Sequence, residues 1–384
     1  MWIRKIKINN FKSLVDFELD LAPFNCLIGL NGSGKSTVLQ AIDFLAQLVR
    51  GDVKEWLRKR RWRAEDLKSH LIDSDSIDFT VEFVSGDRND PIIWSGEYNI
   101  NEYFCVVERL ESPIMRFKVN NGHLMIKDGS TMQVDQDLLM KYEGSVLSGL
   151  SNHIKLMIRQ DFAFQNFLER TKSFDALSPY HLRQKAKYSS GSIGFAGEDF
   201  SAFFFDLESK KRDRIVSSLR KFYPRLVAVE AISSRSGLKR LRVGETFDGK
   251  KYSTESRHVN DGLLRLAALL AMLEDEQNFL SFDEIENGIN PEFVELVIEI
   301  LINAKQQIIV TTHSPMILNF LEDDTARKGV IYLDKRENGT TRATPFFKIP
   351  SVDRKLSVMG PGEAFVDTDL LHLADEIDGM AGAE

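Results

Sequence analysis

Residues 29–36 read Gly-Leu-Asn-Gly-Ser-Gly-Lys-Ser, and this stretch decides the fold. Its glycines let the backbone wrap closely around phosphate oxygens, and its lysine supplies a positive charge. A short apolar strand, residues 24–28, precedes the loop, and apolar residues at helical spacing follow it from Thr37 to Val49. A strand, a glycine loop and a helix in this order are the context that a phosphate-binding loop (P-loop) requires. The sequence therefore predicts a site for the triphosphate of ATP.

Roles within the loop follow from side-chain chemistry. We expect Lys35 to reach the β- and γ-phosphates and the Ser36 hydroxyl to hold Mg²⁺, while the helix directs its positive N-terminus at the phosphates. An incidental glycine turn is the alternative, but it explains neither the strand nor the helix. The predicted nucleotide-binding residues are Asn31, Gly32, Ser33, Gly34, Lys35, Ser36 and Thr37.

Further polar residues stand at the ends of two later apolar strands. After residues 279–282, Asp283 is expected to orient Mg²⁺, and Glu284 to orient the attacking water or accept its proton. After residues 308–312, His313 is expected to hydrogen-bond a γ-phosphate oxygen. Ligands bind at such strand ends in parallel sheets. The alternatives are a simple acidic helix cap for the carboxylates and a structural role for the histidine.

Composition excludes several classes of protein. The chain has 384 residues, 43% hydrophobic and 28% charged, which is ordinary for a globular protein of one or two domains. A net charge of −7 argues against a generic binder of polyanions. No apolar run approaches the roughly 20 residues that span a bilayer, so we expect no membrane association. The two cysteines, Cys26 and Cys105, are expected to be reduced thiols, which suits the cytoplasm.

The chain also changes its pattern along its length. Residues 1–20 and 76–135 alternate as antiparallel strands do, and residues 136–225 look mainly helical but broken by proline and glycine. From Val259 onward, helices alternate with buried strands, which predicts a parallel sheet and an α/β fold. No sustained heptad repeat occurs, so we expect no long coiled coil.

Together these motifs resemble the ABC-type ATPases of the SMC, RecF and OLD group, most closely the stand-alone bacterial "AAA family" ATPases associated with anti-phage defence. The resemblance rests on the P-loop, on Asp283-Glu284, on Thr311-Thr312-His313-Ser314-Pro315, on Asn10-Phe11-Lys12-Ser13 and on the tail 359–364. It implies an ATPase head with a mixed or parallel sheet flanked by helices, an antiparallel β lobe and an inserted helical region. The implied parts are an N-terminal ATPase lobe at 1–135, a helical insertion at 136–226 and a C-terminal ATPase lobe at 227–384.

The resemblance also implies a signature-like motif that closes over the γ-phosphate of a second copy. Asn260, Asp261 and Gly262 match it, with Asn260 in place of the usual serine. Two sites would then form at a homodimer interface. A core helix with a polar cap is the alternative. Lys12 matches a basic position near the nucleotide in relatives.

A basic segment at residues 54–68 surrounds Trp56 and Trp62 with lysines and arginines. Basic groups bind phosphates and tryptophans stack on bases, so nucleic acid is one candidate partner. The alternatives are a solvated helix face with inward-packed tryptophans and a docking surface for an acidic protein.

None of the motifs found in the sequence indicates a nuclease activity. About seventy residues follow His313, which is short for the TOPRIM nuclease domain of OLD-type relatives, and we find neither an HNH-like cluster nor a Cys-x-x-Cys site. A nuclease is therefore disfavoured. By analogy with the family, we expect an ATPase that regulates a separate nuclease or toxin, or clamps nucleic acid, in bacterial anti-phage defence. A nucleotide-gated binding scaffold with little or no turnover is the alternative.

Overall fold

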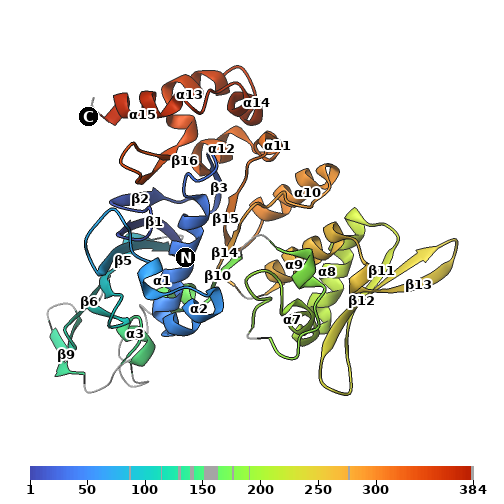
Figure 1. Cartoon of the computed structure of the whole chain (residues 1–384), viewed down its shortest axis with the longest axis horizontal. Coiled ribbons are helices and arrows are strands. Elements are labelled where there is room, and N and C mark those ends of the chain that lie inside the picture. The colour runs from blue at the N-terminus through green and yellow to red at the C-terminus, as the bar shows by residue number, and fades with distance from the viewer. Residues whose placement is uncertain are drawn as a thin grey trace. The chain divides into compact units, whose positions relative to one another are not determined.

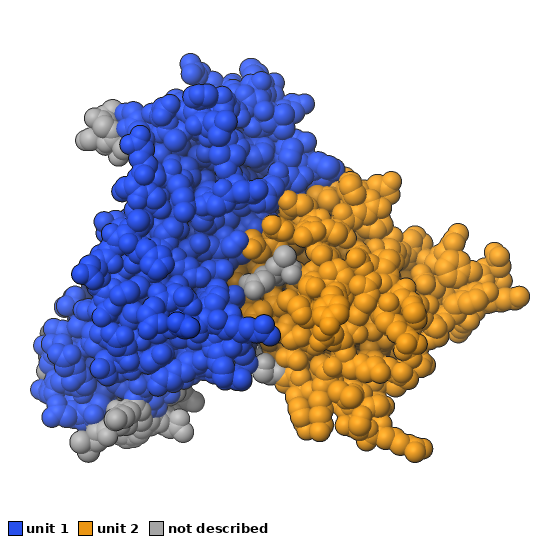
Figure 2. All heavy atoms as spheres, viewed as in Figure 1, with its two compact units in different colours: residues 1–172, 278–280, 307–384 blue, residues 173–277, 281–306 orange. Residues whose placement is uncertain are grey.

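The computed structural model of the chain describes residues 1–85, 88–113, 115–128, 131–138, 142–150, 163–174, 177–189, 191–275 and 277–381. Close contacts divide the chain into two compact units, coloured separately in Figure 2. Unit 1 comprises residues 1–172, 278–280 and 307–384, and unit 2 comprises residues 173–277 and 281–306. The lobe boundaries at 135 and 226 stay a prediction.

Unit 1 contains an antiparallel sheet in the order β2-β1-β4-β5-β6-β7-β8-β9. Figure 1 labels β1, β2, β5, β6 and β9 of this sheet. Period-two alternation buries one face of its strands, as in β4, where Ile77, Phe79 and Val81 are buried. The described strands are β1 (Trp2–Asn9), β2 (Phe17–Asp20), β4 (Ser76–Ser85), β5 (Arg88–Asn99), β6 (Phe104–Glu111), β7 (Met115–Asn120), β8 (His123–Asp128) and β9 (Thr131–Asp137).

A second, mixed sheet has the order β10-β14-β15-β3-β16-β17. Every residue of β3 (Phe24–Ile28) and of β15 (Gln307–Thr311) is buried, and β3 runs parallel to both β15 and β16. Strands covered on both faces read as continuous apolar runs, which is why these two segments do not alternate. The remaining strands are β10 (Thr171–Phe174), β14 (Phe279–Phe282), β16 (Val330–Lys335) and β17 (Thr341–Pro345).

The P-loop helix α1 (Lys35–Arg50) is buried around most of its circumference. Its Phe44 ring contacts Phe11, in the loop between β1 and β2, at 5.4 Å and Tyr98 of β5 at 5.2 Å. The other described helices of unit 1 are α2 (Val53–Arg60), η1 (Ala64–Asp66), α3 (Val146–Gly149), α5 (Ala163–Glu169), α11 (Pro315–Asn319), α12 (Asp323–Gly329), η3 (Phe346–Lys348), α13 (Pro350–Leu356), α14 (Pro361–Val366) and α15 (Leu373–Ala381).

Unit 2 combines a three-stranded antiparallel sheet, β11 (Leu226–Ser233), β12 (Lys239–Phe247) and β13 (Lys250–Glu255), with a group of helices. Phe293 of α10 contacts the rings of Phe222 and Tyr223 at 5.3 and 5.5 Å, which joins α10 to the C-terminal end of α8. The helices are α6 (Pro179–Leu182), α7 (Phe200–Asp206), α8 (Ser209–Phe222), η2 (Ser256–His258), α9 (Asp261–Glu274) and α10 (Pro291–Ile302).

These elements confirm the predicted fold class, with an antiparallel β part and a mixed sheet flanked by helices. The longest helix within the described ranges is α1, with 16 residues, so no long coiled coil occurs there. None of the helices in that part of the chain is both long and apolar enough to span a bilayer.

A buried carboxylate fastens residues 145–146 to the antiparallel sheet. Glu108 on β6 is fully buried and accepts hydrogen bonds from Trp94 Nε1 at 2.7 Å, from Val146 N at 2.8 Å and from the Ser145 hydroxyl. Burial raises the pKa of Glu108 from its ordinary value of 4.5 to about 7, because the lost hydration of the carboxylate outweighs the three hydrogen bonds that favour its charged form.

This shifted pKa predicts a pH dependence of stability. The folded-state pKa lies above the unfolded one, so the free energy of unfolding should fall as pH rises from about 4.5 to about 7, by at most about 1.4 kcal/mol per pH unit. Urea unfolding at several pH values measures this slope. Glu108→Gln should flatten the slope relative to wild type, and an unchanged slope in the variant would contradict the assignment to Glu108.

Candidate nucleotide-binding site

The P-loop adopts a conformation that its glycines make accessible. Gly29, Gly32 and Gly34 have φ angles of +144°, +78° and +109°, a region that other residues rarely occupy. Two of them also approach neighbouring strands. A Cβ on Gly29 would lie 2.2 Å from the Leu333 carbonyl oxygen, and one on Gly34 would lie 2.5 Å from Thr341 Oγ1. These positions therefore need glycine for the turn and for the packing of the loop.

Lys35 opens α1 and is 6% exposed. Its Nζ donates hydrogen bonds to the carbonyl oxygens of Gly29 at 2.9 Å and Leu30 at 3.1 Å, so the ammonium group lies against its own loop. Among the described residues, the buried Ser33 hydroxyl has no hydrogen-bond partner. A positive charge, a spare hydroxyl and a backbone turned by glycines together fit a phosphate group. Of the remaining predicted loop residues, Asn31 and Ser36 are exposed and Thr37 is half-buried.

Thr341 of β17 braces the P-loop through a hydrogen bond to Ser33, and the sequence did not predict this contact. Its Oγ1 lies 3.1 Å from the Ser33 carbonyl oxygen and 2.8 Å from Ser13 Oγ, and its backbone N–H donates to the Ser13 carbonyl oxygen at 2.8 Å. Ser33 and Thr341 are 308 positions apart. Nothing local in the sequence marks such a pair, because the mixed sheet alone brings β17 under the P-loop.

Lys12 lies beside α1. Its Nζ donates to Gln40 Oε1 at 2.8 Å and sits 3.5 Å from the centre of the Trp62 ring. Its backbone is in the left-handed region, with φ at +50°, and its N–H donates to the Leu67 carbonyl oxygen at 2.9 Å. The structure thus fixes Lys12 near the first turns of the P-loop helix, and its role toward nucleotide stays a prediction.

His313 follows the strand that neighbours the P-loop strand. Thr311 of β15 pairs with Leu27 of β3 in parallel register, and the Thr312 N–H donates to the Leu27 carbonyl oxygen at 3.1 Å. The carboxyl ends of parallel strands share one sheet edge, so unit 1 carries the P-loop and the exposed His313 at the same edge.

Unit 2 holds the predicted carboxylates in a strained turn. Glu284 is exposed and has φ at +49°, which is uncommon for a residue with a side chain. Asn287 stabilises the turn, since its N–H donates to the Glu284 carbonyl oxygen at 2.9 Å and its Nδ2 to Glu284 Oε2 at 3.2 Å. Asp283, which is half-buried, donates its N–H to the Phe174 carbonyl oxygen at 3.2 Å. The roles of Asp283 and Glu284 toward nucleotide stay predictions.

Arg265, which the sequence analysis did not single out, connects this turn to α9. Its Nη1 donates to the Asn287 carbonyl oxygen, and a Cβ on Gly288 would lie 2.9 Å from its Nε. Burial lowers the pKa of the guanidinium, while the charge of Glu284 opposes that shift. Arg265 therefore links the signature-like helix to the carboxylate turn within unit 2.

The signature-like residues stand at the N-terminus of α9. Asn260 Oδ1 accepts from Leu263 N at 2.8 Å and from the Tyr223 hydroxyl at 3.2 Å, which makes Asn260 the helix cap. Arg183 forms an ion pair with Asp261 at this end of the helix. A Cβ on Gly262 would lie 3.1 Å from the Tyr223 hydroxyl, so a larger residue fits there only if this neighbour shifts by a few tenths of an ångström. The cap expected from a plain core helix is present, and a role across a dimer interface stays a prediction.

Of the two tryptophans of the basic segment, Trp56 packs inward and Trp62 is half-buried. Trp56 is 2% exposed and donates to Asp43 Oδ2 at 2.7 Å, and Arg60 pairs with the same carboxylate at 3.0 Å. The Trp56 and Trp62 rings contact each other at 5.4 Å. Arg58 pairs with Glu55, and Lys68 pairs with Asp75. This arrangement matches the alternative of a structural helix face and weakens the argument for base stacking.

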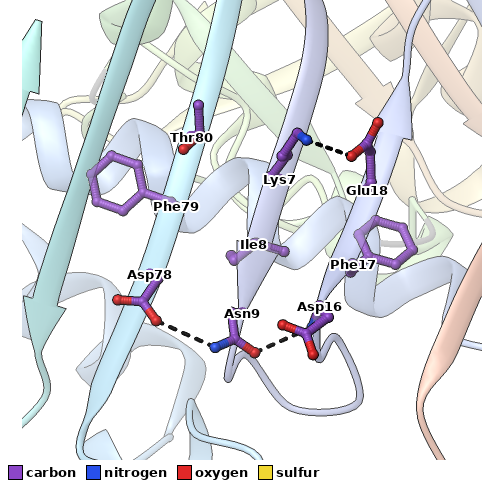
Figure 3. Close-up of a pocket in the computed structure, with 9 residues that line it drawn as sticks. All are labelled: Lys7, Ile8, Asn9, Asp16, Phe17, Glu18, Asp78, Phe79 and Thr80. Atoms are coloured by element: carbon purple, nitrogen blue, oxygen red, sulfur yellow. Dashed lines mark hydrogen bonds and ion pairs between the residues drawn. The ribbon is translucent and has the colours of Figure 1, made fainter.

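A hollow of about 310 Å³ on the strands β1, β2 and β4 is not suited to phosphate. Figure 3 shows its carboxylates, Asp16, Glu18 and Asp78, with Lys7 bound to Glu18 and Asn9 bound to Asp78. Burial raises the pKa of Asp78. An acidic lining repels anions, so we assign the nucleotide site to the P-loop.

Residues 24–319 match the family described as "AAA domain, putative AbiEii toxin, Type IV TA system". The chain belongs to this family. Its motifs and fold are those of ABC-type ATPases of the SMC, RecF and OLD group, as the sequence predicted.

Curated relatives and solved structures agree with this family. The OLD nuclease of Thermus scotoductus is 24% identical over 221 residues, which are 51% of this chain and 40% of that protein. RecF of Actinobacillus pleuropneumoniae, a DNA replication and repair protein, is 46% identical over 46 residues, 12% of this chain and 13% of RecF. The chain thus spans less than half the length of either relative.

Two solved SMC heads share the fold with TM-scores of 0.54. An SMC head bound to the C-winged helix domain of ScpA is 14% identical, covering 90% of this chain and 97% of that chain. An SMC head with an extended coiled coil, from Pyrococcus furiosus and bound to the C-terminal domain of ScpA, is 11% identical, covering 93% of this chain and 99% of that chain.

The Thr341 brace yields a prediction about ATP affinity. Thr341→Val removes the hydroxyl that bridges Ser33 and Ser13, and the loss of one hydrogen bond of about 1 kcal/mol should weaken ATP binding about five-fold. Thr341→Ser should retain wild-type affinity. Thr340→Val is the matched control, because its hydroxyl bonds only to Asn338 among the described contacts. Calorimetric titration with ATP measures the Kd values, and equal affinity of Thr341→Val and Thr340→Val would refute the brace.

Proposed function

We propose that this protein binds ATP with Mg²⁺ and hydrolyses it. The observation that carries the proposal is the P-loop itself, in which three left-handed glycines and the buried Lys35 build a phosphate cradle at the start of α1. Loop residues 31–37 would hold the triphosphate. Ser36 and Asp283 would hold Mg²⁺, which supplies charge neutralisation at the phosphate oxygens when bound.

Each of the remaining predicted residues would have its own role in hydrolysis. Glu284 would orient water or accept its proton, and Asn287 keeps the Glu284 side chain in one orientation through the 3.2 Å bond. His313 would donate a hydrogen bond to a terminal phosphate oxygen, and Lys12 would add positive charge. These roles need the residues of units 1 and 2 to meet around one nucleotide.

We further propose that a second copy of the chain completes each site. Asn260, Asp261 and Gly262 begin the 14-residue helix α9, whose N-terminus attracts anions. The family resemblance places this end opposite the nucleotide of the other copy. ATP would then join two chains, and the change between joined and separate states would act on a partner.

The partner is proposed from the relatives alone. The family description names a toxin, and the matched curated proteins are a nuclease and a DNA repair protein. A separately encoded nuclease or toxin, or a clamped nucleic acid, fits these names, in a cytoplasmic anti-phage system. One observation favours a gated scaffold with slow turnover as the second candidate. Asn260 stands where the family has serine, and its side chain is held in the cap of α9 by Leu263 N and the Tyr223 hydroxyl, so its amide NH₂ would have to reach phosphate from that fixed position.

Binding and turnover of three variants test the proposal. Lys35→Ala should weaken ATP binding at least about ten-fold, through the loss of a charge-assisted contact of roughly 1.5–3 kcal/mol. Glu284→Gln should bind ATP like wild type and lose roughly a hundred-fold or more in kcat. Glu292→Gln, an exposed carboxylate on α10, is the control and should match wild type.

Calorimetry and a phosphate-release assay provide both quantities. Absence of ATP binding by wild type and Glu284→Gln would end the proposal. Tight binding with no turnover in wild type would instead support the gated scaffold.

A further inference from the structure

The C-terminal tail packs against the helix that follows His313. Helix α14 lies on α11 within unit 1, and Pro361, Gly362 and Ala364 on its inner side are buried. The Gly360 N–H donates to Glu363 Oε2 at 3.2 Å and the Thr368 hydroxyl donates to the Ala364 carbonyl oxygen, so both ends of α14 are fixed.

Gly362 makes the closest approach between the two helices. A Cβ at this position would lie 2.1 Å from Asn319 Oδ1 and 2.5 Å from the Pro315 carbonyl oxygen. Carbon atoms do not approach oxygen this closely without displacement. Pro315 and Asn319 are the first and last residues of α11, so the glycine touches the helix along its whole length. Any side chain at 362 must push α11 away, since one of the two contacts is backbone.

The residues on either side of His313 are fixed, Thr312 by the mixed sheet and Ser314 by α11. On one side, the Thr312 N–H is bound to Leu27 at the end of the P-loop strand. On the other side, Ser314 caps α11 by accepting from Met316 N at 3.3 Å, and the Ser314 N–H donates to Thr312 Oγ1 at 2.9 Å. With the sheet side fixed, a displacement of α11 reaches His313 through a single residue, Ser314.

We propose that the tail segment Met359–Val366 is a clasp that positions His313, with Gly362 as the positioning residue. The inference rests on the proposed ATPase function of the same site. The clasp acts on the direction of the imidazole and leaves the P-loop untouched, so it should change the rate of turnover and spare ATP binding.

Gly362→Ala tests the clasp, and Gly360→Ala is its matched control, because a Cβ at 360 meets nothing within 4 Å. We expect Gly362→Ala to lower kcat about ten-fold or more while KM for ATP changes less than about two-fold, as misplacement of a catalytic group predicts. Gly360→Ala should match wild type. Combining Gly362→Ala with Asn319→Gly removes the side-chain part of the clash and should recover part of kcat even if the single variant is poorly stable.

The effect of Gly362→Ala in a His313→Ala background shows whether Gly362 acts by positioning His313 or by a general loss of structure. In a His313→Ala background, Gly362→Ala should change kcat less than about two-fold, because residues that act as one unit are not additive. An undiminished effect in that background, or wild-type kcat in either Gly362→Ala or His313→Ala, would overturn the clasp.

An NMR measurement keeps the clasp testable if wild type shows no turnover, which would refute the proposed function itself. The ring C–H signal of His313, identified by its loss in His313→Ala among seven histidines, should shift in Gly362→Ala and stay in place in Gly360→Ala. An identical signal in both glycine variants would refute the clasp on its own.

Discussion

The packing of the P-loop onto the mixed sheet is the constraint on which the rest of unit 1 depends. Gly29 meets the Leu333 carbonyl oxygen of β16, and Gly34 meets the Thr341 side chain of β17, at distances that exclude a Cβ. The loop is therefore seated on strands that lie more than 300 residues later in the chain. The same sheet carries β15 and brings His313 to the edge where the loop begins, so one set of strand contacts positions both the P-loop and His313.

Polar contacts then hold each predicted site residue in place within its loop, turn or helix. Lys35 lies against its own loop, Asn287 holds Glu284, Arg265 ties the Glu284 turn to α9, and Asn260 caps that helix. Lys12 and Glu284 are both in the left-handed region of the backbone. Unit 1 holds the P-loop and His313, and unit 2 holds Asp283, Glu284 and the signature-like residues.

Much of this could be predicted from local patterns, because local patterns express local physics. The glycine loop, the buried strands predicted at 24–28 and 308–312 and the alternating strands from residue 76 onward follow from periodicity and turn residues. Thr341, Arg265 and Gly362 could not be found in this way, since each acts on a segment distant in the sequence. The tryptophans of the basic segment illustrate the opposite case, in which a local pattern fits both stacking and burial, and a contact with Asp43 on the neighbouring helix accompanies the burial of Trp56.

If ATP completes its site between two copies of this chain, as we propose, the mass of the protein in solution depends on nucleotide. The mass of Glu284→Gln in solution, measured by light scattering with saturating ATP and Mg²⁺ and again without nucleotide, tests it most directly. We expect the mass of one 43.8 kDa chain without nucleotide and twice that mass with ATP, and we expect Asp261→Arg to prevent the change. A single-chain mass in the presence of bound ATP would contradict the claim.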